Sequence, residues 1–121
     1  MEINMTILIG GSRDYNDYNN FTVQMNNIIS KLNTEDIIIL SGHCLGVDAL
    51  GEKYAVEKGY ELKLFPADWT RYGRAAGPIR NRTMAEIADL VIAFWDGKSK
   101  GTKSLISIAE KLNRPVIIVG L

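Results

Sequence analysis

Residues 5–14 have the sequence MTILIGGSRD, an apolar run that ends in two glycines and a short polar loop. The run Met5–Ile9 has the length and β-branched content of a buried strand. Four further runs of this kind follow along the chain, each with a glycine or proline within two residues of its end. They are Ile37–Leu40, Tyr60–Phe65, Leu90–Trp95 and Pro115–Val119. The sequence therefore predicts five short strands.

Segments of helical periodicity separate these strands. Apolar residues recur at helical spacing in residues 21–32, 47–54, 79–88 and 105–112. Strict alternation with nearly all-apolar strands predicts an α/β fold, with a parallel sheet covered by helices on both faces. The simplest topology is a doubly wound, Rossmann-like sheet of order 3-2-1-4-5. The one long irregular stretch is Pro66–Gly77, and loops of this length are usually functional or mobile.

Length and composition indicate one domain over residues 1–121. The single cysteine, Cys44, excludes an internal disulfide and suits a reducing compartment. No apolar run approaches the ~18 residues of a membrane span. The chain enters its first strand without the basic region of a signal peptide. We therefore expect a cytoplasmic protein with no membrane partner.

Charge is balanced overall but unevenly distributed. Fourteen basic and fourteen acidic residues cancel, so nucleic acid is not expected as a partner. Four arginines and no acid lie between Trp69 and Ala85, and three lysines and no acid lie between Gly97 and Ser104. Such stretches are either solvated surface or part of a site, depending on their place in the fold.

Three glycine-containing loops follow strands that the predicted order brings together. In open α/β sheets, ligands bind at the C-terminal strand ends where the strand order reverses, here between the first and fourth strands. Glycines let backbone N–H groups approach an anion, and a helix N-terminus adds unpaired donors. Phosphate capture is the predicted chemistry, and an arginine at the start of the third helix would add a bidentate grip. The predicted ligand-binding residues of these loops are Gly10, Gly11, Ser12, Arg13, Ser41, Gly42, Gly46, Arg80, Ser99, Gly101 and Thr102.

Several familiar sites are absent from the sequence. It contains no G-x-x-x-x-G-K-[ST] motif, and its first loop is not G-x-G-x-x-G. A Walker-type NTPase and dinucleotide redox chemistry are therefore not expected, and no cofactor is predicted. No spacing of His, Cys and Asp indicates a metal site.

An ordered set of short motifs covers nearly the whole chain and resembles the SLOG superfamily, within it the YspA/YpsA-like group. The motifs are Gly10-Gly11-Ser12-Arg13-Asp14, Ser41-Gly42-x-x-x-Gly46-Val47-Asp48, Pro66-Ala67-Asp68-Trp69, Gly73-x-x-Ala76-Gly77-Pro78-x-Arg80-Asn81 and Ser99-x-Gly101-Thr102. The resemblance implies a Rossmann-like domain that binds or processes nucleotides or ligands derived from NAD or ADP-ribose. Relatives include the LOG phosphoribohydrolases and the DNA-processing protein DprA, and many form dimers or larger assemblies. A homo-oligomer is expected on this ground.

One departure bears on catalysis. The LOG hydrolases carry P-G-G-x-G-T-x-x-E, and Leu105 occupies the position of that glutamate here. LOG-type hydrolysis is therefore in doubt. Asp48 and Asp68 are the alternative catalytic candidates, although Asp48 equally suits a helix first turn and Asp68 equally suits a role in shaping its loop.

Two further residues, Trp69 and Asn81, each have two interpretations. Trp69 either stacks on a base or ribose or anchors its loop. Asn81 either hydrogen-bonds the ligand, which the family motif favours, or satisfies a loop carbonyl. His43 has no orienting partner that the sequence reveals, and Trp95 is expected in the core. The leading hypothesis is a nucleotide-binding sensor, carrier or sequestering protein. A nucleotide-processing hydrolase and a DNA-associated module similar to DprA are the alternatives.

Overall fold

The apolar run at the start of the chain forms the central strand of a parallel sheet. In the computed structural model, which describes residues 4–121, five strands are ordered β3-β2-β1-β4-β5. The predicted fold class and strand order are confirmed. The expectation about a signal peptide concerns the start of the chain, and residues 1–3 lie outside the described residues. In chain order the elements are β1 (Met5–Gly11), α1 (Tyr18–Ser30), β2 (Ile37–Ser41), α2 (Val47–Lys58), β3 (Glu61–Leu64), α3 (Trp69–Tyr72), the 3₁₀ turn η1 (Gly73–Ala75), α4 (Ala76–Ile87), β4 (Leu90–Trp95), α5 (Lys100–Lys111) and β5 (Val116–Gly120).

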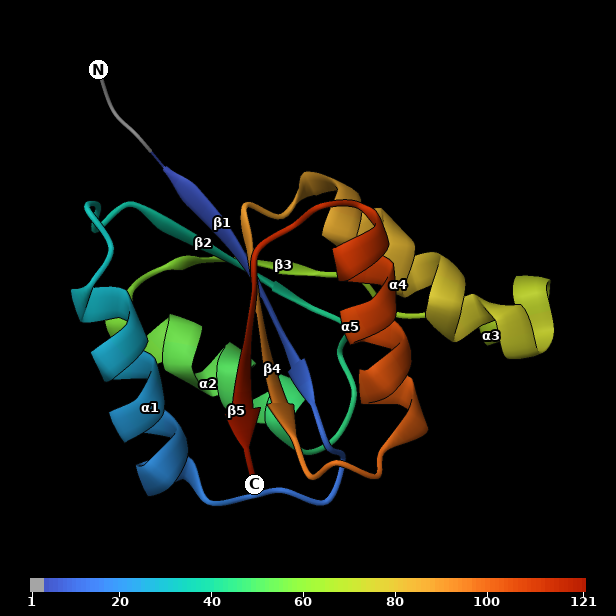
Figure 1. Cartoon of the computed structure of the whole chain (residues 1–121), viewed down its shortest axis with the longest axis horizontal. Helices are drawn as coiled ribbons and strands as arrows, with labels where there is room; N and C mark the ends of the chain where they lie inside the picture. Colours follow the sequence, from blue (N-terminus) through green and yellow to red (C-terminus); the bar gives the residue numbers. More distant parts are fainter. Residues whose placement is uncertain (1–3) are drawn as a thin grey trace.

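Strand β1 pairs with β2 on one side and with β4 on the other. Met5 lies opposite Ile37 in the first pair, and Ile7 lies opposite Leu90 in the second. The strand order reverses between β1 and β4, which pair in parallel and lie next to each other at the middle of the sheet in Figure 1. The loops that follow β1 and β4 therefore lie at one edge, which is where the site is expected.

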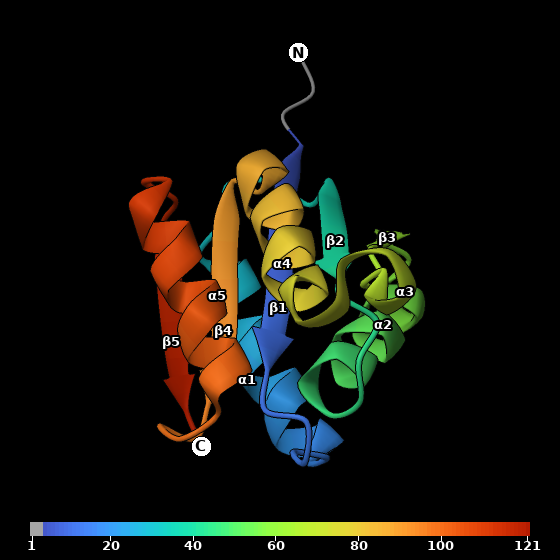
Figure 2. The ribbon, with the colours of Figure 1, turned by 90° about the vertical axis from the view of Figure 1, so that its right-hand side faces the viewer.

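Alternate side chains of β1 pack into two separate hydrophobic cores, one on each face of the sheet. Ile7 and Ile9 pack with Phe21 and Met25 of α1 and with Tyr54 of α2. Leu8, on the opposite face, packs with Met84 of α4 and Leu105 of α5. Because neighbouring strand residues point to opposite faces, this alternation places α1 and α2 on one face and α4 and α5 on the other. The two helical layers are visible in Figure 2, where α4 and α5 stand in front of the sheet.

The prediction that Pro66–Gly77 is irregular is wrong in part. The stretch contains helix α3 and the turn η1, and α4 already begins at Ala76. Asp68 caps α3, since its carboxylate accepts a hydrogen bond from the N–H of Arg71 at 3.1 Å. A helix of four residues is too short to produce a periodic apolar pattern, which explains why it was not predicted. In Figure 1 this segment projects away from the sheet.

Candidate functional site

A pocket lies at the C-terminal edge of the sheet, where β1 and β4 diverge. Its volume is about 150 Å³. The loops after β1, β2 and β4 all contribute to its walls, together with α4 and the start of α5. Of the predicted site residues, those that line it are Gly10, Gly11, Arg13, Gly42, Asp48, Arg80, Asn81, Ser99, Gly101 and Thr102. The structure thus brings together residues that are up to 92 positions apart (10 to 102) in the sequence.

The pocket depends on glycine where other groups approach the backbone closely. A Cβ at Gly42 would lie 2.7 Å from Nη1 of Arg80 and 3.0 Å from Oδ2 of Asp48. A Cβ at Gly10 would lie 2.7 Å from the side chain of Leu105. Since real Cβ contacts are longer than this, a larger residue at either position would displace the groups that form the walls. These glycines are therefore needed for the shape of the pocket.

The start of helix α5 forms one wall. Ser99 is the N-cap, and its hydroxyl accepts from the N–H of Thr102 and lies 3.1 Å from the hydroxyl of Thr102. The loop that leads into the helix is held by Asp96, whose carboxylate accepts from the N–H groups of Lys98 and Ser99, both at 2.8 Å. These two hydrogen bonds, that of Ser99 first, lower the pKa of Asp96. A helix N-terminus held in this way presents N–H groups and a positive dipole end to the pocket.

Trp95 also contacts the wall formed by the start of α5. The sequence predicts a core role, but the ring is only half-buried and its Nε1 donates to the carbonyl oxygen of Ser99 at 3.0 Å. The indole N–H therefore fixes the cap residue of α5. Tryptophan N–H groups usually find a partner when they are partly buried, but the sequence does not reveal which partner.

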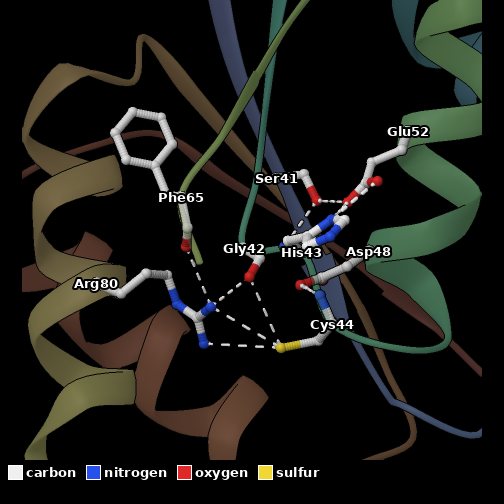
Figure 3. Close-up of polar contacts among 8 residues, drawn as sticks. All are labelled: Ser41, Gly42, His43, Cys44, Asp48, Glu52, Phe65 and Arg80. Atoms are coloured by element: carbon white, nitrogen blue, oxygen red, sulfur yellow. Dashed lines mark hydrogen bonds and ion pairs between the residues drawn. The ribbon is translucent and has the colours of Figure 1, made fainter. Parts of the chain in front are cut away.

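Arg80 reaches from α4 to the loop after β2, as Figure 3 shows. Its Nη1 donates to the carbonyl oxygens of Gly42 at 2.6 Å and Phe65 at 3.4 Å, and its Nε donates to Oδ1 of Asn81 at 2.8 Å. Both Nη atoms also contact the sulfur of Cys44, at 3.8 and 3.9 Å. The two carbonyls occupy Nη1, so the predicted bidentate grip on an anion is not available, and Nη2 is the group that can serve a ligand.

Asp48 places a carboxylate in the pocket wall. It lies in the first turn of α2, is 8% exposed, and accepts a hydrogen bond from the N–H of Cys44 at 3.2 Å. Burial raises the pKa of Asp48, while the Cys44 hydrogen bond and the charge of Arg80 act in the opposite direction. The wall therefore carries two cationic side chains, Arg13 and Arg80, and one acid.

Five predicted site residues do not line the pocket. Ser12 and Ser41 are buried behind it. Gly46 is the N-cap of α2 with φ of 72°, and a Cβ there would collide with the carbonyl oxygens of Ser12 and Arg13. Asp68 caps α3, as described above. Trp69 is 53% exposed and lies at a neighbouring depression, which shares Arg13 and Cys44 with the pocket.

The sequence gives no signal for Glu52, which the structure brings to this region. Its carboxylate accepts from the hydroxyl of Ser41 at 2.7 Å and lies 3.0 Å from Nδ1 of His43 (Figure 3). His43 therefore has an orienting partner. The pair escapes a motif search because it depends on the loop conformation at His43, whose φ is 60°.

Two classes of feature are not found within residues 4–121. No three potential metal-ligating side chains come together there. No helix in this range combines the length and the apolar character that crossing a bilayer requires.

Comparison with known proteins places the chain in a family. The model of the YspA, cpYpsA-related SLOG family matches residues 5–72, more than half of the chain. The Gene 61 protein of Mycobacterium phage D29 is 30% identical over 122 residues, covering 94% of this chain and 95% of that protein. These matches confirm the resemblance seen in the motifs.

A solved structure shares the fold. DNA processing protein A from Helicobacter pylori, described as having a unique single-stranded DNA binding mode, matches with a TM-score of 0.63 and 20% sequence identity. The match covers 94% of this chain and 64% of that one. The expectation that nucleic acid is not a partner is thereby corrected. A neutral total charge does not exclude nucleic acid, because contacts to phosphate depend on the charges near the site rather than on their sum.

Proposed function

The chain belongs to the YspA, cpYpsA-related SLOG family, and we propose that its pocket binds the phosphate of a nucleotide or nucleotide-derived ligand. One observation carries the proposal: the N-terminus of α5, with the hydroxyls of Ser99 and Thr102, meets Arg13 and Nη2 of Arg80 in one pocket. Backbone N–H groups, hydroxyls and guanidinium groups are the donors that bind phosphate in proteins.

Leucine in place of an acid supports binding rather than turnover. Leu105 lines the pocket, is 4% exposed and packs against Gly10. Among the hydrolases that the motifs resemble, a glutamate holds this position. A methyl group offers neither a proton nor charge to a reacting ligand. The proposed role is therefore that of a sensor, carrier or sequestering protein.

Isothermal titration calorimetry tests the proposal. We expect binding to at least one of AMP, NAD, ADP-ribose and cyclic ADP-ribose. Ser99→Ala should weaken that binding about threefold to tenfold, because it removes one donor to the phosphate. Ser104→Ala is the matched control, since Ser104 lies on the same helix and does not line the pocket. If no member of the panel binds, or if both variants behave alike, the proposal is wrong.

A second candidate function is single-stranded nucleic acid binding. Helix α3 exposes Trp69 and Tyr72, and the guanidinium of Arg71 lies 5.0 Å from the centre of the Tyr72 ring. Exposed aromatic rings beside arginines form the kind of surface on which unpaired bases stack. The single-stranded DNA binding mode described for the H. pylori protein, which shares this fold, favours the same test.

Fluorescence anisotropy with a labelled single-stranded oligonucleotide distinguishes the two candidates. If DNA binds, the affinity should fall steeply between 50 and 200 mM salt, as roughly expected for phosphate contacts. Tyr72→Ala should weaken it, whereas Tyr60→Ala, just after the C-terminal end of α2 and outside α3, should leave the contact surface unchanged. If no salt-dependent DNA binding is seen, nucleic acid binding is ruled out and small-ligand binding is the remaining candidate.

A further inference from the structure

The loop after β2 holds an imidazole in a fixed orientation beside the pocket. The N–H of His43 donates to the hydroxyl of Ser41 at 3.1 Å, and that hydroxyl donates to Glu52 at 2.7 Å. Nδ1 of His43 lies 3.0 and 3.2 Å from the two oxygens of the same carboxylate. Backbone, ring and carboxylate are thus connected in one closed network, drawn in Figure 3.

This network determines which ring nitrogen is available. An ionised carboxylate only accepts hydrogen bonds, so Nδ1 must carry its proton when it faces Glu52. Nε2 is then the nitrogen that can serve another molecule, and 54% of the His43 side chain is exposed. His43 also has a φ of 60°, a conformation uncommon outside glycine that is often found at functional sites.

His43 lies at a depression that adjoins the phosphate pocket. Its volume is about 490 Å³, compared with about 150 Å³ for the pocket. Arg13 and Cys44 line both, so the two lie side by side. Two large apolar side chains border the depression and are open to solvent, Leu45 at 76% and Trp69 at 53%. Exposed apolar groups that gather beside polar ones mark binding surfaces.

We infer that this depression is the subsite for a nucleobase, with Nε2 of His43 as the hydrogen-bond partner of the base edge. A nucleobase has two apolar faces and a polar edge, which matches apolar side chains beside an oriented imidazole. The pocket alone is smaller than the roughly 300–1,000 Å³ of typical small-molecule sites, so a nucleotide must extend beyond it. The inference rests on the proposed phosphate site and names the ligand class, a nucleoside phosphate rather than a sugar phosphate.

Calorimetry with matched ligands separates the two subsites. AMP, GMP, CMP and UMP are compared with ribose 5-phosphate, which has the sugar and phosphate but no base. At least one nucleotide should bind about tenfold more tightly than ribose 5-phosphate. Equal affinities for all five ligands would overturn the base subsite and leave the phosphate site standing, whereas no binding by any of them, nor by NAD, ADP-ribose or cyclic ADP-ribose, would overturn both.

Variants assign the contribution of each side chain. His43→Asn keeps a residue that tolerates positive φ and should weaken nucleotide binding roughly threefold to tenfold. Trp69→Leu, at an exposed position, should weaken it about tenfold without loss of stability. Neither should change binding of ribose 5-phosphate. Equal losses for both ligands would contradict the inference, and Trp69→Leu keeps the test decisive if the loop does not tolerate His43→Asn.

Glu52 is a positioning residue, and NMR tests it directly. The chain has one histidine, so its ring ¹⁵N signals belong to His43 alone. Glu52→Gln should raise the share of the Nε2–H tautomer and weaken nucleotide binding, whereas Glu110→Gln, on the far part of α5, should change neither. The ring signals should shift on addition of the nucleotide and not of ribose 5-phosphate. Unchanged signals with bound nucleotide would show that His43 does not contact the base.

Discussion

Nη1 of Arg80 donates to the carbonyl oxygen of Gly42 at 2.6 Å, and this hydrogen bond joins α4 to the loop after β2. The same guanidinium also binds the carbonyl of Phe65 after β3. One side chain thus satisfies backbone acceptors at two neighbouring strand ends. It shapes the pocket as well as lining it.

Arg80→Lys should therefore cost both stability and ligand affinity. A lysine has one point charge and cannot serve both carbonyls and Asn81 in this geometry. We expect the free energy of unfolding to fall by about 1.5–3 kcal/mol, the range for hydrogen bonds to charged groups. Urea denaturation measures the loss. Arg82→Lys is the control, because Arg82 is exposed and pairs with Glu86 at the surface, where a change of about 0–1 kcal/mol is expected. Equal effects would contradict the bridging role.

Gly46→Ala should destabilise the protein more than Gly59→Ala. Both glycines have a positive φ, 72° and 73°. Gly59 adopts the left-handed α conformation with ψ of 23°, whereas Gly46 has ψ of −128°, outside that region. A Cβ at Gly46 would collide with the backbone of Ser12 and Arg13, whereas a Cβ at Gly59 meets nothing within 4 Å. We expect about 1 kcal/mol for the strain at Gly59 and several kcal/mol at Gly46. Thermal unfolding of the two variants measures the difference, and similar melting temperatures would contradict the expected collision at Gly46.

Gly101→Ala should raise the stability of the protein while lowering its affinity for nucleotide. Gly101 lies in the first turn of α5 and a Cβ there meets nothing within 4 Å. Alanine is the better helix former, so the free energy of unfolding should rise by about 0.5–1 kcal/mol. The added methyl group would stand at the wall where phosphate is expected to approach the backbone. Nucleotide affinity should therefore fall in a more stable protein. A gain in both would show that the anion does not approach this residue.

Asp48→Asn should stabilise the protein at neutral pH. Burial raises the pKa of Asp48 in the folded state, so folding favours its protonated form. The carboxyl contributes stability below its unfolded pKa, and this contribution is lost as pH rises through the folded pKa. The advantage of the variant should therefore be largest near pH 7 and shrink on acidification toward pH 4. Urea denaturation at several pH values measures this trend, and an advantage that grows on acidification would contradict it.

The same substitution separates binding from hydrolysis. If the pocket only binds, removal of a negative charge should strengthen phosphate binding at pH 7. If Asp48 is a catalytic carboxylate, turnover of a nucleotide by the wild-type protein should be lost while binding persists. Calorimetry and product analysis by chromatography distinguish the two outcomes.

The sequence predicts the fold and the place of the pocket because both depend on local patterns. Apolar strands alternate with helices, and each strand of the switch point has a glycine at its end or within two residues of it. What the sequence cannot reveal are partners set by tertiary geometry. Glu52 meets His43 only because His43 adopts a left-handed conformation, and Trp95 reaches Ser99 across a turn. The short helix α3 depends on one cap, Asp68, which leaves no periodic pattern.

Trp69 illustrates the limit most clearly. Its motif predicts a ligand role, and the structure places it at the depression beside the pocket rather than in the pocket itself. The position depends on α3, which the apolar pattern does not predict. The direction of a side chain on such a segment is fixed by the N-cap that precedes it and the turn that follows it, not by residue type.

The walls of the pocket come from two parts of the chain, residues 8–48 and residues 80–105. A ligand held between them would tie these parts together, and neither part could open without releasing it. Native-state hydrogen exchange should then slow in β4 as well as in β1 when ligand is added, by the same factor. The two halves of the sheet would then open as one cooperative unit, and the rate of hydrogen exchange in both halves would depend on the ligand concentration.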